Sequence, residues 1–156
     1  MGRSLKKKHG DLILSSNLST FTNGLELQGG ALTLANSSTG SVLNQLVTGP
    51  LGTGTLTIDG GTTVQADGTA RAIFNAVTVA GDFTFGGGTT GNNLTLNGVI
   101  DLGSGIRTVT VTNPLVTGTL GGAVSGAGGL TKSGNGILLL SGGNSYTVPP
   151  PYWEAS

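Results

Sequence analysis

Residues 77–96 read VTVAGDFTFGGGTTGNNLTL, and this stretch decides the fold class. It contains the same three-residue word, apolar–Thr–apolar, at 77–79, 83–85 and 94–96. An alternation of period two places apolar side chains on one face of a strand and threonine on the other. Glycines separate the words, and glycine tolerates the positive φ angles of sharp corners. The stretch therefore predicts short β-strands, buried on one face and joined by tight turns.

The same word recurs on both sides of this stretch, at 32–34, 56–58 and 109–111. Words that start at 32, 56, 77, 94 and 109 are 24, 21, 17 and 15 residues apart, with a mean close to 19. Repeats of about 20 residues, each a strand and a turn, are typical of stacked coils. We therefore predict an all-β fold, a parallel β-helix (β-solenoid) of roughly seven coils that covers residues 11–147.

An antiparallel β-sandwich is the alternative, because its strands also alternate and end in turns. Sandwich strands usually carry many charged residues on their outer face, whereas only 9% of this chain is charged. The outward positions here are mostly Thr, Ser, Asn and Gly, which favours the solenoid. The chain has no cysteine, so disulfides and thiolate chemistry are excluded. With five prolines and no glycine at every third position, it is not collagen-like.

Charge is concentrated at the N-terminus, where Arg3, Lys6, Lys7 and Lys8 lie within eight residues. We predict that residues 1–10 are a disordered, solvated basic leader and that residues 148–156 are a Pro-rich C-terminal tail. The remainder carries no basic stripe, so no nucleic-acid partner is expected. The apolar run after the leader is too short for a signal peptide or a membrane span. An export signal is therefore expected to lie outside this sequence.

Candidate catalytic groups are few. His9, the single histidine, lies in the leader, where a catalytic role is not expected. Of the carboxylates Asp59, Asp67, Asp82 and Asp101, the last two are 19 residues apart, which would stack them on neighbouring coils at glycosidase-like separation. Arg71 and Arg107 are the basic residues that a lyase-like site would use. Each Asp adjoins a turn, where Asp commonly caps the backbone, so we predict no enzyme activity.

Metal and cofactor sites are not indicated either. A calcium-binding solenoid repeats G-G-x-G-x-D every nine residues, and this spacing is absent. The glycine-rich words precede strand-like segments and not helices, so they are turns and not phosphate loops.

Threonine columns are a further possibility, since a flat row of threonines on a solenoid can bind ice or polysaccharide. Stacked coils would align five threonines if the coils kept a constant length. These are Thr33, Thr57, Thr78, Thr95 and Thr110. The uneven intervals argue against a lattice, so ordinary solvent-facing threonine is the default interpretation.

Residues 126–147 read GAGGLTKSGNGILLLSGGNSYT. This segment resembles the autotransporter-associated β-strand repeat, also called the passenger-associated transport repeat, whose pattern is G-x-G-x-L-x-K-x-G-x-G-x-L-x-L-x-G-x-N-x-Y-x-G. Eleven positions match in one register. They are Gly126, Gly128, Leu130, Lys132, Gly134, Gly136, Leu138, Leu140, Gly142, Asn144 and Tyr146. Val148 stands where the pattern has its last glycine.

The resemblance implies an extracellular or bacterial cell-surface passenger with a right-handed parallel β-helix. In that fold the three matched leucines would point inward, Gly134 and Gly136 would form a corner, and Tyr146 would close over the coil edge. We expect a non-enzymatic structural module, either an adhesin-like stalk or a self-assembling fibre subunit. Its expected partners are its own copies stacked end to end, other β-helix coils, or surface glycans. The alternatives are a carbohydrate-binding or carbohydrate-cleaving β-helix and an ice-binding solenoid.

Overall fold

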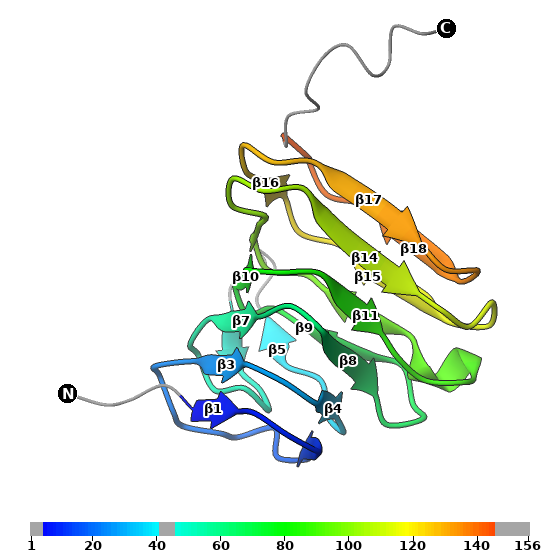
Figure 1. Cartoon of the computed structure of the whole chain (residues 1–156). Helices are drawn as coiled ribbons and strands as arrows, with labels where there is room; N and C mark the ends of the chain where they lie inside the picture. The colour runs from blue at the N-terminus through cyan, green and yellow to red at the C-terminus, as the bar shows by residue number, and fades with distance from the viewer. Residues whose placement is uncertain (1–4, 41–45, 146–156) are drawn as a thin grey trace, which may run out of the picture.

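The computed structural model describes residues 5–40 and 46–145, and almost all of their regular structure is β-strand. Successive turns of the chain add parallel strands to the same three sheets in chain order. Figure 1 shows this as a steady rise of colour from blue at β1 to orange at β17 and β18. The chain is therefore an all-β solenoid of about six turns, which confirms the predicted fold class with one turn fewer than the expected seven. The antiparallel sandwich is excluded.

Two of the sheets run through all six turns. Sheet 1 consists of β1 (Leu5–Lys7), β3 (Leu25–Leu27), β7 (Leu56–Ile58), β10 (Val77–Val79), β13 (Ile100–Asp101) and β16 (Val124–Ser125). Sheet 2 consists of β2 (Asp11–Leu14), β4 (Ala31–Leu34), β8 (Thr62–Ala66), β11 (Phe83–Phe85), β14 (Arg107–Val111) and β17 (Leu130–Ser133).

Sheet 3 belongs to the last four turns. It consists of β9 (Arg71–Ile73), β12 (Leu94–Leu96), β15 (Thr117–Leu120) and β18 (Ile137–Leu140). A single 3₁₀ turn, η1 (Thr90–Asn92), precedes β12.

The core consists of apolar columns that run along the solenoid axis. In sheet 1 one column contains five side chains that are at most 2% exposed, joined by the parallel register. They are Leu25, Leu56, Val77, Ile100 and Val124. Sheets 2 and 3 contribute similar columns, and the threonines between them face outward. The period-two alternation thus builds one continuous apolar interior from many three-residue strands.

The repeat length differs from the predicted mean because the repeated word occurs on all three sheets. The word at 32–34 lies in sheet 2, the one at 56–58 in sheet 1, and the one at 94–96 in sheet 3. Register partners in the sheet 1 column are 31, 21, 23 and 24 residues apart. The shorter intervals in sequence were steps from one side of a coil to another.

The longest repeat is the second turn, where the chain leaves the solenoid after β4. Strands β5 (Thr39–Gly40) and β6 (Leu46–Thr48) form an antiparallel pair there. The Ser38 backbone N–H donates to the Ala72 carbonyl at 3.0 Å, and the Ser38 hydroxyl accepts from the Phe74 N–H at 2.7 Å. This segment therefore covers the edge of β9 and replaces a fifth strand of sheet 3.

The solenoid begins earlier than the predicted boundary at residue 11. Leu5–Lys7 forms β1, which pairs in parallel with β3, so part of the predicted leader is the first strand. The sequence interpretation gave weight to the lysines and missed the register of Leu5 with Leu25. The predicted tail at 148–156 lies outside the described residues.

Candidate functional site

The matched repeat forms the last described turn, made of β16, β17 and β18. Leu130, Leu138 and Leu140 are partly buried and pack against the core, as the resemblance implies. The Asn144 side-chain oxygen accepts the Val124 backbone N–H at 3.1 Å, which ties the end of this turn to its beginning. Tyr146 lies outside the described residues. The repeat is therefore one complete coil laid on the coil before it.

The glycines of the repeat lie where backbones of neighbouring turns approach closely. A Cβ on Gly128 would lie 1.8 Å from the Gly105 carbonyl oxygen, and one on Gly142 would lie 2.1 Å from that of Gly122. Real Cβ atoms do not approach so closely, so only glycine fits. Gly122 in turn lies over Gly98, where a Cβ would be 1.8 Å from the carbonyl oxygen. The glycine column is thus the cost of stacking tight corners directly on one another.

The remaining glycines of the repeat serve the corners in different ways. Gly134 has φ +81°, a left-handed conformation that L side chains rarely adopt. Gly136 is buried, and a Cβ there would lie 2.4 Å from a Val111 methyl carbon. Gly126 has φ +132° and follows β16. Gly134 and Gly136 lie between β17 and β18, so they form the corner that the resemblance implies.

Lys132 is the charged residue of the repeat. It lies on β17, in register with the fully buried Val109 of the previous turn. Its side chain is exposed, and the ammonium donates to the Gly134 carbonyl at 2.6 Å. A position that is apolar and inward in the turn below is therefore occupied by a cation on the last described turn.

The predicted carboxylate pair is not formed. Asp82 follows the sheet 1 strand β10, and its side chain accepts the Thr108 backbone N–H at 2.8 Å. Asp101 lies on β13 in register with Thr78, and its side chain accepts the Gly103 N–H at 2.8 Å. The two aspartates cap different corners because the 19-residue interval between them is shorter than a full turn.

The other residues of the predicted lyase-like site are also separate. Asp59 lies between β7 and β8, where its carbonyl accepts the Thr62 hydroxyl. The Arg107 Nε–H donates to the Val79 and Leu102 carbonyls at 2.9 and 3.0 Å. His9 is exposed at the turn after β1. Among the described residues, no group of three or more His, Cys, Asp or Glu side chains is arranged to hold a metal ion.

The predicted row of five threonines is divided among the sheets. Thr33 and Thr110 lie on sheet 2, Thr57 and Thr78 on sheet 1, and Thr95 on sheet 3. The longest threonine column that the register joins is Thr63, Thr84 and Thr110 on sheet 2. The expected single row was wrong, because its members came from different sides of the coil.

The Thr63–Thr84–Thr110 column lines a shallow depression of about 380 Å³ on the outer face of sheet 2. Its lining is polar backbone and hydroxyl groups with a single carboxylate. The lining residues are Gly61, Thr62, Thr63, Asp82, Phe83, Thr84 and Thr110. The Phe83 ring is buried, so the depression has no aromatic platform.

A curated relative shares most of this solenoid. The chain is 34% identical over 129 residues to the protein named adhesin BmaC autotransporter of Brucella suis biovar 1 (strain 1330). The aligned region covers 80% of this chain and 4% of the relative. The chain is autotransporter passenger-like. No family model matches it, and no solved structure matches it. Among the described residues of this passenger-like chain, no helix has the length and apolar character needed to cross a membrane.

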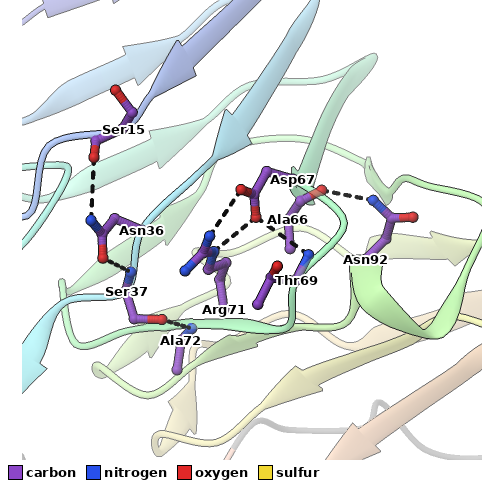
Figure 2. Close-up of polar contacts among 9 residues, drawn as sticks. All are labelled: Ser15, Asn36, Ser37, Ala66, Asp67, Thr69, Arg71, Ala72 and Asn92. Atoms are coloured by element: carbon purple, nitrogen blue, oxygen red, sulfur yellow. Dashed lines mark hydrogen bonds and ion pairs between the residues drawn. The ribbon is translucent and has the colours of Figure 1, made fainter.

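Side-chain amides and hydroxyls join neighbouring turns of the passenger-like chain at its corners, as Figure 2 shows. The Asn36 amide donates to the Ser15 carbonyl of the turn below at 3.2 Å. On the next turn, the Ala72 backbone N–H donates to the Ser37 hydroxyl at 3.1 Å. These contacts satisfy backbone groups where the chain bends out of the strand ladder.

An ion pair lies at the next corner in the same view. Arg71 Nε and Nη2 donate to the two Asp67 carboxylate oxygens at 2.8 and 2.9 Å (Figure 2). The hydrogen bonds from the Arg71 guanidinium hold the pKa of the Asp67 carboxyl below its ordinary value. Asn92 donates to the Ala66 carbonyl beside this pair at 2.8 Å. This arrangement orders a corner and leaves no carboxyl poised as a general acid.

Replacing Arg71 with glutamine should lower the free energy of unfolding at pH 7 by less than about 1 kcal/mol, because the pair is largely exposed. The folded-state pKa of Asp67 is depressed, so the stabilisation is present above the unfolded pKa near 4 and is lost as the pH falls through the folded value. Urea unfolding at pH 7 and at pH 2 measures this. The difference between wild type and Arg71→Gln should vanish at pH 2, and adding Asp67→Asn to the variant should change nothing further.

Two positioning residues escaped the sequence interpretation. Asn75 is fully buried and donates to the Gly52 and Gly54 carbonyls at 3.1 and 2.7 Å, which anchors the segment that returns from β6 to β7. Lys7 is only 8% exposed, and its ammonium donates to the His9 and Gly10 carbonyls. The alternation of Leu5, Lys6 and Lys7 was the available signal, because it puts Lys7 on the same face as Leu5.

Proposed function

We propose that this chain is a non-enzymatic stalk segment of an extracellular, adhesin-like passenger. The observation that carries the proposal is the apolar column, which continues without interruption through all six turns. A solenoid of this kind transmits length and stiffness along one axis, because each turn contacts only its neighbours. The name of the Brucella relative, an autotransporter adhesin, supports the cell-surface location and the adhesin class.

The proposal includes further coils as partners. Leu130, Leu138 and Leu140 are only partly buried on the last turn, and Leu12 and Leu14 are only partly buried on the first. The edges of β16, β17 and β18 have no strand partner among the described residues. Unpaired parallel edges beside incompletely buried leucines fit another parallel β-helix coil.

A second candidate function is binding of surface glycans in the depression on sheet 2. Its support is the in-register column of Thr63, Thr84 and Thr110 beside the Asp82 carboxylate. The stalk is favoured because the depression is shallow and lacks an exposed aromatic ring on which a sugar would stack.

Glycan arrays and a reducing-end assay on the purified full chain distinguish these functions. A stalk gives no saturable glycan signal and releases no reducing ends from polysaccharides. Thr84→Val is the matched variant, because valine keeps the branched strand-forming shape and removes only the hydroxyl. A saturable signal that Thr84→Val weakens about tenfold would transfer the function to carbohydrate binding. Release of reducing ends would contradict the non-enzymatic proposal.

A further inference from the structure

Both end turns of the described solenoid place a lysine at a position that is apolar and inward in the adjacent turn. Lys7 on β1 is in register with Leu27, and Lys132 on β17 is in register with Val109. Both of these partners are 0% exposed. Between the two ends the inward strand positions are occupied mainly by apolar side chains. Inward-pointing charges at a sheet edge are a known means of blocking edge-to-edge association.

The two lysines meet at one corner of the coil when the register is followed along the axis. Beneath Lys132 the same column contains Val109, Phe83 and Thr62. It continues to Gly30 and Gly10, because the Thr63 N–H donates to the Gly30 carbonyl at 3.1 Å and the Ala31 N–H to the Gly10 carbonyl at 2.9 Å.

The Lys7 ammonium lies at the bottom of this column. It donates to the Gly10 carbonyl at 2.5 Å and to the Gly29 carbonyl at 3.4 Å. A Cβ on Gly30 would lie 2.5 Å from this nitrogen, which places the ammonium directly under the next turn. One column therefore has a cation at each end.

Head-to-tail stacking of two copies would bring these cations together. If the first turn of one copy continued the sheets of another in register, the Lys7 ammonium of the first would arrive over Lys132 of the second. Arg107, one turn below Lys132, adds a further positive charge at this corner. Two ammonium groups in a joint that excludes water repel each other, and neither finds a carboxylate there.

We propose that Lys7 and Lys132 prevent this chain from stacking end to end with its own copies. The last described turn then accepts a parallel coil that brings a carboxylate or a neutral side chain over Lys132. This inference rests on the proposed stalk function and selects other β-helix coils, and not a second copy, as the partner. The shared strand geometry supplies the attraction, and the lysines supply the selectivity.

Sedimentation velocity of the full chain over a range of concentrations tests the proposal. Wild type should remain monomeric, and Lys132→Glu should associate at least about 100-fold more tightly, because its new carboxylate would face Lys7. Raising the salt concentration to 1 M should weaken the association of Lys132→Glu. Thr131→Glu is the matched control, since it adds a carboxylate one residue away on an exposed, outward position and should stay monomeric.

The double variant Lys7→Glu with Lys132→Glu restores like charges and should be monomeric again. Circular dichroism checks that each variant keeps its β-structure, and Lys132→Gln gives the neutral case if the double variant does not fold. Wild type that forms rods, or a Lys132→Glu variant that stays as monomeric as Thr131→Glu, would overturn the proposal. Neither result bears on the glycan and reducing-end assays, so failure of the selectivity and failure of the stalk function are distinguishable.

Discussion

Phe85→Ala is expected to lower the free energy of unfolding by about 3–5 kcal/mol, the range for removing a large aromatic side chain from a core. Phe85 is 1% exposed on β11, and its ring packs edge to face on Phe83 with centroids 5.2 Å apart. The ring extends across the interior to sheet 3, where a Cβ on Gly118 would lie 2.3 Å from it. Its loss would leave a cavity that short, hydrogen-bonded strands cannot close.

Equilibrium urea unfolding of the variant, with Ile13→Ala as control, measures this effect. Ile13 is 63% exposed on β2, so its truncation should cost less than about 0.5 kcal/mol. The packing of the ring on Gly118 has its own test, because Gly118→Ala should destabilise wild type more than it destabilises a Phe85→Leu background. Equal costs of Gly118→Ala in both backgrounds would show that the ring does not require glycine there.

Gly122→Ala is expected to cost about 2–4 kcal/mol, through overpacking of backbone against backbone. The added Cβ would lie 1.8 Å from the Gly98 carbonyl oxygen, and a carbonyl in the strand ladder cannot move away as a flexible side chain would. The shift would also disturb the turn above, because Gly142 packs in the same way on Gly122.

Gly143→Ala is the matched control for Gly122→Ala. It is the neighbour of Gly142 on the last turn, and a Cβ there would have no heavy atom within 4 Å. Urea midpoints for the two variants should therefore differ clearly, with Gly143→Ala close to wild type. Coincident midpoints would mean that adjacent corners can separate without loss of stability.

The fold class could be predicted from local pattern alone, because apolar–Thr–apolar words and glycine turns describe a strand buried on one side wherever they occur. The same uniformity concealed which side of the coil each word occupies. Leu32, Leu56 and Leu94 begin identical words on three different sheets, so spacing in sequence was not spacing along the axis. Parallel register is a long-range property and is fixed by the stacked columns.

The glycines illustrate the limit of the site prediction. Sequence reasoning gave them a role in corners through positive φ, and Gly134 has this conformation. Gly128 and Gly142 are required for another reason, the closeness of Gly105 and Gly122 in the turn below. Only the three-dimensional neighbours reveal that reason. Lys7 was missed in the same way, since its role depends on the buried partner Leu27 one turn away.

The excursion between β4 and β7 has a consequence for how such a shaft diversifies. Sheets 1 and 2 pass through that turn without a break, while the third side leaves the stack and returns through Asn75 and the two serines that cover β9. Two sides of a triangle are thus enough to hand the register onward. The third is a permissive graft site, where foreign sequence can be displayed laterally at a chosen height without altering the turns above or below it.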